Sequence, residues 1–120
     1  MDKIENGKYS VLLRDDYLKE LQKVRGSTER DVCIQNAFVE YLALPEGARY
    51  RETEKQTVHV TSAADVQRDY TMVLDIVYIP DEIVERLLPH SVYGEVGLDR
   101  NVNTALRLWL QARNVGNLRV

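Results

Sequence analysis

The chain has 120 residues, of which 44% are hydrophobic and 29% charged, and its formal net charge at pH 7 is −3. This length fits one domain or two very small ones, and the polar first residues and lack of a long apolar run argue against a leader or a membrane span. The negative net charge argues against indiscriminate nucleic-acid binding. Cys33 is the single cysteine, so we expect a buried structural thiol, no intrachain disulfide and a cytoplasmic location.

The first predicted element is a strand, because the stretch "YSVLL" alternates in character. Successive side chains of a strand point to opposite faces. One face then carries Tyr9, Val11 and Leu13, and the other carries Lys8, Ser10 and Leu12.

Two amphipathic helices are predicted next. The shorter helix begins near Asp15, which together with Asp16 is suited to capping, and it ends at Gly26. Its apolar stripe is predicted to contain Leu18, Leu21 and Val24. The longer helix ends before Pro45, and the spacing i, i+3, i+4, i+7, i+8 gives it a continuous stripe. The stripe consists of Ile34, Ala37, Phe38, Tyr41 and Leu42.

Residues 45–69 form a polar connector with one alternating stretch, "QTVHVT". A connector of this length is long for a structureless loop in a compact domain. The alternation favours an extra strand beside the second predicted strand, and a solvated linker is the alternative.

The strand and helix pattern then returns in "DIVYIPDEIVERL", where Asp81 corresponds to Asp15. A strand from Leu74 to Ile79 is predicted, with Leu74, Ile76 and Tyr78 on its outer face, followed by a short helix after Pro80. A last helix from about Asp99 repeats the long stripe, with Ala105 in the place of Ala37. Its stripe consists of Val102, Ala105, Leu106, Trp109 and Leu110. Neither copy can bury its stripe alone, so we expect the two copies to pack on each other.

The order strand, helix, helix, with "I..AF..YL" and "V..AL..WL" in the longer helices, resembles the ribbon-helix-helix (MetJ/Arc-type) superfamily, in a tandem arrangement. The resemblance implies an α+β, mostly helical fold in which duplicated strand-helix-helix units form a single-chain pseudo-dimer with an antiparallel β-ribbon. The copies span residues 7–44 and 70–113, and residues 114–120 follow as a basic tail.

The resemblance implies a sequence-specific DNA-binding protein, such as a transcriptional regulator or a plasmid or phage DNA-processing accessory. It assigns the major-groove contacts to Lys8, Ser10, Leu12, Leu74, Ile76 and Tyr78, and the phosphate contacts to Arg30 and Arg100. Asp31 and Asp99 stand where the family has a serine or threonine cap, so they are predicted to cap the longer helices and to oppose a phosphate there.

A second interpretation is a protein-binding module on the same scaffold, such as a phage-borne inhibitor or an antitoxin-like partner, that uses the apolar strand face. His59 and His90 lack partners at metal-ligand spacing, so no metal and no cofactor are expected. The acidic pairs Asp15-Asp16 and Asp81-Glu82 fall at helix starts, where structural roles are expected rather than catalysis. We therefore expect a non-enzyme whose partner is double-stranded DNA or a protein, and leave homo-oligomerisation open.

Overall fold

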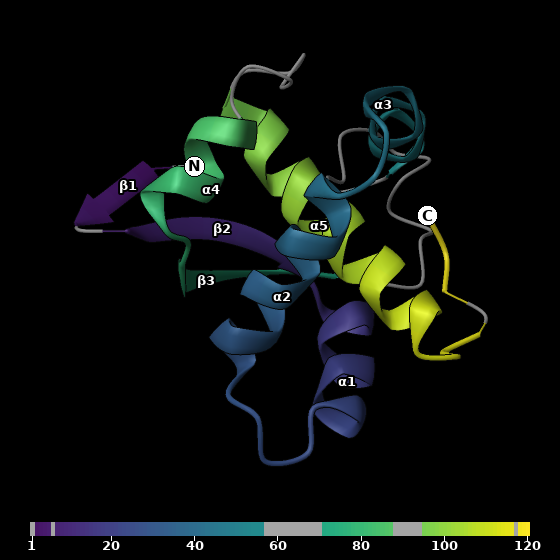
Figure 1. The fold of residues 1–120 in the computed structure, drawn as a ribbon. Coiled ribbons are helices and arrows are strands. Elements are labelled where there is room, and N and C mark those ends of the chain that lie inside the picture. Colours follow the sequence, from purple (N-terminus) through teal and green to yellow (C-terminus); the bar gives the residue numbers. More distant parts are fainter. Residues whose placement is uncertain (1, 6, 57–70, 88–94, 117) are drawn as a thin grey trace.

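The computed structural model describes residues 2–5, 7–56, 71–87, 95–116 and 118–120, which form an α+β fold that is mostly helical (Figure 1). The strands are β1 (Asp2–Glu5), β2 (Lys8–Arg14) and β3 (Met72–Tyr78). The helices are α1 (Asp15–Val24), α2 (Arg30–Leu42), α3 (Glu46–Lys55), α4 (Asp81–Leu87) and α5 (Glu95–Ala112).

The strands form one antiparallel sheet in the order β1-β2-β3. β2 and β3 pair without interruption from Lys8 opposite Tyr78 to Arg14 opposite Met72. The predicted antiparallel pairing of these two strands is thus confirmed. β1 pairs only with the first half of β2, and it was not predicted because its residues are mostly charged.

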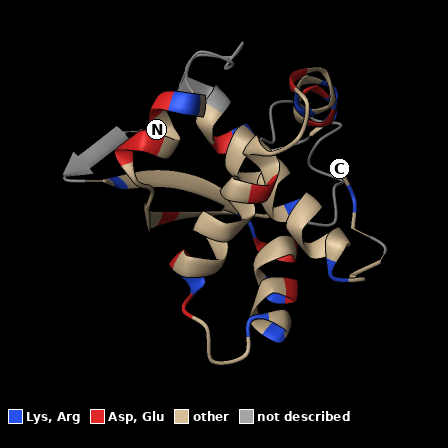
Figure 2. Ribbon diagram, viewed as in Figure 1, with Lys and Arg blue, Asp and Glu red and all other residues tan. Residues whose placement is uncertain are grey.

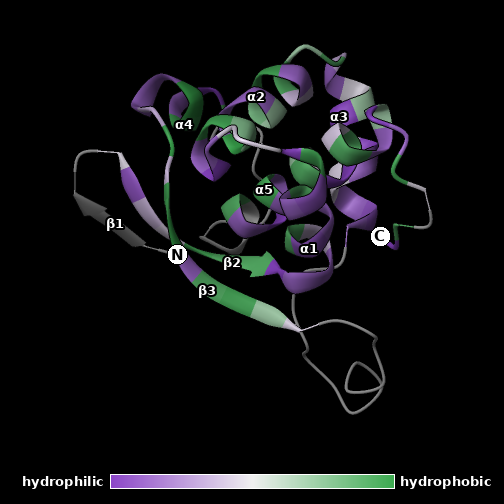
Figure 3. Cartoon of the chain, turned by 90° about the horizontal axis from the view of Figure 1, so that it is seen from below, coloured by the Kyte–Doolittle hydropathy of each residue, from purple (hydrophilic) through white to green (hydrophobic). Residues whose placement is uncertain are grey.

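The helices gather on one side of the sheet, and the other side of the β2–β3 pair is left open by the described residues (Figure 3). The core lies between sheet and helices, and α2 and α5 pack against each other within it. All ten predicted stripe residues of these two helices are buried, as is Cys33. Val24 is predicted to lie in the apolar stripe of α1, but it is the last residue of the helix and its side chain is exposed.

The first half of the connector is a helix, α3, which was not predicted. Its sequence, "EGARYRETEK", has no apolar stripe, and polar contacts with α5 hold it in place. The expected strand in "QTVHVT" falls, apart from Gln56, outside the described residues, and so do His59 and His90.

The start of the last helix was also predicted wrongly. α5 begins at Glu95, so Asp99 lies inside the helix and not at its cap. Asp31 is the second residue of α2, whose N-cap position is Glu29. In α1 the N-cap is Arg14 and no side chain caps the helix, so the predicted capping role of Asp15 or Asp16 is wrong as well.

Candidate functional site

The six strand residues to which the resemblance gives DNA contacts lie on one face of the β2–β3 pair, which we call the outer face. They form three cross-strand pairs: Lys8 with Tyr78, Ser10 with Ile76, and Leu12 with Leu74. The backbone N–H of Ile79 donates a hydrogen bond to the carbonyl of Gly7 (2.7 Å), and the N–H of Asp15 donates one to the carbonyl of Thr71 (3.0 Å). These two bonds show which residue pairs of the ladder are hydrogen-bonded and which are not. The three outer pairs are therefore non-hydrogen-bonded pairs, in which opposed side chains come closest together.

The outer face is predominantly apolar. Leu74 is 67% exposed, Ile76 50% and Tyr78 43%, although all three are large hydrophobic residues. Lys8 is the one cation among the six, and charged residues are sparse along both strands in Figure 2. A group of exposed apolar side chains on a regular scaffold is typical of an interaction surface.

Gly7 positions the ring of Tyr78 at one end of this face. Gly7 has a φ of +80°, a conformation that suits glycine. A Cβ atom added to Gly7 would lie 2.7 Å from Cε2 of Tyr78, so the ring approaches the backbone closely. The absence of a side chain at residue 7 therefore lets Tyr78 lie against the turn between β1 and β2.

Two aspartates of the longer helices bind the free edges of the strands. Asp99 accepts a hydrogen bond from the backbone N–H of Leu12 at 3.0 Å, beyond the point where β1 ends. Asp31 accepts one from the backbone N–H of Tyr78 at 3.3 Å. These carboxylates therefore satisfy strand-edge donors, and the predicted capping role is wrong.

Asn103 of α5 completes the edge of β2. Its carboxamide accepts a hydrogen bond from the N–H of Arg14 (2.9 Å) and donates to the carbonyl of Leu12 (2.9 Å). Asn103 is fully buried, and it also donates to the carbonyl of Asp99 at 2.7 Å. The sequence carries no clear signal for this role, because Asn101 and Thr104 beside Asn103 are polar as well.

Arg30 lies at the edge of β3 and is bound by carboxylates. It forms ion pairs with Asp75 and with Asp31 and donates a hydrogen bond to the carbonyl of Ile76 at 2.8 Å. Burial acts to lower the pKa of Arg30, but the bond and charge of Asp75 and the charge of Asp31 outweigh it and raise the pKa. Two carboxylates thus offset the charge that a phosphate contact would use.

Arg100 faces α3 rather than the outer face, because it donates to the backbone carbonyls of Gln56 and Glu54. Two arginines that follow Arg100 along the chain form ion pairs, Arg107 with Glu52 at 3.0 Å and Arg113 with Glu40 at 2.8 Å. The locally basic character of the sequence after Arg100 therefore does not produce an unopposed basic patch among the described residues.

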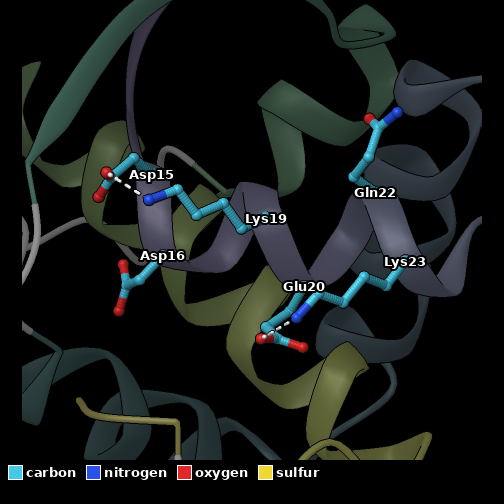
Figure 4. A pocket seen from close by; sticks show the side chains of 6 residues that line it. All are labelled: Asp15, Asp16, Lys19, Glu20, Gln22 and Lys23. Carbon is cyan, nitrogen blue, oxygen red and sulfur yellow. Dashed lines mark hydrogen bonds and ion pairs between the residues drawn. The ribbon is translucent and has the colours of Figure 1, made fainter.

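The acidic pair at the start of α1 lines an open hollow along that helix (Figure 4). Asp15 accepts a hydrogen bond from the N–H of Thr71 at 2.8 Å, and Asp16 binds Arg14. Burial acts to raise the pKa of Asp15, but the bonds from Thr71 and the charge of Lys19 outweigh it and lower the pKa. A lowered pKa and fixed partners indicate a structural carboxylate.

No protein-family model, curated protein or solved structure matches this chain. Within the described ranges, no group of three or more His, Cys, Asp or Glu residues could hold a metal ion. None of the helices in the described part of the chain is both long and apolar enough to cross a membrane.

Proposed function

We propose that the chain is a single-chain pseudo-dimer of two strand-helix-helix units and that its outer face binds a protein partner. The register of β2 and β3 supports the duplication. When Asp15 is aligned with Asp81, Ile76 becomes the counterpart of Ser10, and these two residues are directly opposed in the sheet. In the same alignment the pair of Lys8 with Tyr78 corresponds to the pair of Leu74 with Leu12. A twofold relation between the copies requires this pattern.

The aspartate contacts support the same relation. Tyr78 is the counterpart of Leu12 in the strand alignment, and Asp99 is the counterpart of Asp31 when Ala37 is aligned with Ala105. Asp99 binds the backbone of Leu12, and Asp31 binds the backbone of Tyr78. Each strand is thus bound by the longer helix of the other copy, as expected if two equivalent units exchange contacts across a twofold axis.

The exposed apolar side chains of the outer face carry the proposal of a protein partner. Leu74, Ile76 and Tyr78 offer a large apolar area, and Tyr78 adds a hydroxyl that can hydrogen-bond at the rim. A few residues supply most of the affinity of a protein interface, and tyrosine is one of the residue types most often found among them. The base edges of DNA are read mainly by Arg, Lys, Asn and Gln. Among the six residues of the outer face, Lys8 is the only one of these types.

The experiment compares the parent with a variant carrying Leu74→Ser and Ile76→Ser. Because both side chains are exposed, we expect its free energy of unfolding to change by less than about 1 kcal/mol. A partner captured by the parent from a lysate of the encoding organism, and identified by mass spectrometry, should be lost from the variant. Equal capture by both proteins would place the binding site elsewhere.

DNA binding is the second candidate, and one observation favours it. The six residues to which the resemblance gives major-groove contacts are gathered in opposed pairs on one face, with Lys8 at its end. Fluorescence anisotropy with a mixed-sequence duplex library tests it. Affinity that falls steeply with salt, and that Lys8→Gln weakens, would favour DNA over a protein partner.

A further inference from the structure

Among the described residues, only the later part of the outer edge of β3 has partners for its outward backbone groups. In the antiparallel ladder, Met72, Leu74, Ile76 and Tyr78 direct their N–H and C=O groups away from β2. Side chains occupy the later part of this edge, where Asp75 and Arg30 bind the backbone of Ile76 and Asp31 binds that of Tyr78. In the part of the chain that the structure describes, nothing binds the outward groups of Met72 or Leu74.

The corresponding edge of β2 is paired. Lys8, the counterpart of Leu74, pairs with Glu5 of β1, and Ser10 pairs with Asp2. Within the described ranges, a strand therefore pairs with Lys8 and Ser10 of β2, whereas no strand pairs with Leu74 and Ile76 on the outer edge of β3. Unpaired strand edges favour the addition of another strand.

Apolar side chains are exposed on both faces of β3 beside this open edge. Val73 is 39% exposed on the helix-facing side, and its neighbour Leu74 is 67% exposed on the outer face. A ligand on the outer face would cover Leu74 and leave Val73 in water. A strand added beside β3 would shield both residues, because its side chains alternate between the two faces.

We infer that the occupant of this edge is β3 of a second copy, paired antiparallel about a twofold axis at Val73. This register places Met72 of each copy opposite Leu74 of the other, so that their outward N–H groups and carbonyls form hydrogen bonds. The stretch 72–74 contains no charge, and each Asp75 faces a neutral Thr71, so no like charges oppose each other. The combined sheet has three strands from each copy, and the two outer faces become one continuous apolar surface.

The mass of the protein in solution tests this inference, by sedimentation equilibrium or light scattering. The parent should have twice the mass of one chain at high concentration. Leu74→Pro removes an N–H that points away from β2, so the intramolecular ladder survives while the variant becomes monomeric. The control Leu74→Thr keeps the N–H and should stay dimeric. A monomeric parent would overturn the inference. A parent dimer that is lost in Leu74→Thr but kept in Leu74→Pro would also overturn it, because that dimer would depend on the side chain of Leu74 and would be formed by stacked outer faces.

A disulfide test does not depend on the folding of the proline variant. In the proposed register the two Val73 residues form a non-hydrogen-bonded pair at the axis, with Cβ atoms close enough for a disulfide. Val73→Cys combined with Cys33→Ala should form a covalent dimer under mild oxidation, and Val39→Cys in the same background, on the exposed side of α2, should not. Equal cross-linking of both variants would contradict the inference. Self-association through this edge is independent of the proposed protein partner, because the disulfide test reports only whether Val73 of one copy lies beside Val73 of the other.

Discussion

Asp99 on α5 binds the backbone of Leu12 on β2, with its carboxylate oxygen 3.0 Å from the Leu12 nitrogen. The contact lies where β1 no longer covers β2, so a helix side chain takes the place of a neighbouring strand. Asp99 is buried, whereas the side chain of Asp31, which makes the related contact with Tyr78, is 34% exposed. The two aspartates therefore differ in how readily water can replace them.

This difference predicts unequal costs of removal. Asp99→Ala leaves the N–H of Leu12 without its acceptor, and we expect the free energy of unfolding to fall by about 1–3 kcal/mol. Asp31→Ala should cost less, because water can reach the N–H of Tyr78. Urea denaturation of both variants measures the difference. If Asp99→Ala were neutral, the contact would not contribute to holding α5 against the sheet.

Replacing Gly7 should disturb the outer face through Tyr78. Gly7→Ala places a Cβ atom 2.7 Å from the ring of Tyr78, at a φ that disfavours alanine. We expect a loss of about 1–3 kcal/mol in the free energy of unfolding. A double-mutant cycle with Tyr78→Ala separates the two causes: the part due to the ring should disappear, and the part due to φ should remain. An additive cycle would mean that the ring and Gly7 do not interact.

Both long helices should be needed for stability. Phe38 on α2 and Leu106 on α5 are fully buried, so Phe38→Ala and Leu106→Ala should each cost about 2–5 kcal/mol. Val39, next to Phe38, is exposed, and Val39→Ala should change stability by less than about 0.5 kcal/mol. Chemical denaturation of the three variants provides the test, and a neutral Leu106→Ala would exclude α5 from the core.

The ion pair between Glu52 of α3 and the buried Arg107 of α5 should make stability depend on pH. Burial acts to raise the pKa of Glu52, but hydrogen bonds from Lys55 and Arg107 outweigh it and lower the pKa below its ordinary value of 4.5. A carboxylate with a lowered pKa contributes stability above its unfolded pKa, and the contribution is lost as pH falls through the folded pKa.

Glu52→Gln removes that contribution. The variant should be less stable than the parent at neutral pH, and the difference should shrink as the pH falls below 4.5. Urea denaturation over a pH series measures it. A difference that stays constant with pH would show that the charge of Glu52 does not stabilise the docking of α3.

The sequence was sufficient to predict the elements that repeat. Alternation and helical spacing identified β2, β3 and the stripes of α2 and α5, because each signal extends over several residues and both copies carry it. Alternation alone also places counterparts such as Ser10 and Ile76 on one face, and the two residues pair there.

The parts that depend on long-range polar contacts could not be predicted. α3 has no apolar stripe, and what fixes it is a set of bonds from Arg107 and Arg100 on α5, far along the chain. The sequence predicts Asp31 and Asp99 to be caps, because a helix cap and an acceptor at a strand edge use the same residue type. Their partners, the free amides of two strands, become apparent only when the sheet is assembled.

Site-specific photo-cross-linking at Tyr78 tests the central claim, a protein-binding outer face, most directly. Tyr78 and Tyr50 are similarly exposed, at 43% and 47%, but Tyr78 lies on the outer face and Tyr50 on α3. Each is replaced in turn by p-benzoylphenylalanine, and the protein is irradiated in cells of the encoding organism. We expect a discrete protein adduct from position 78 and none from position 50. Adducts at both positions, or DNA instead of protein at position 78, would contradict the claim.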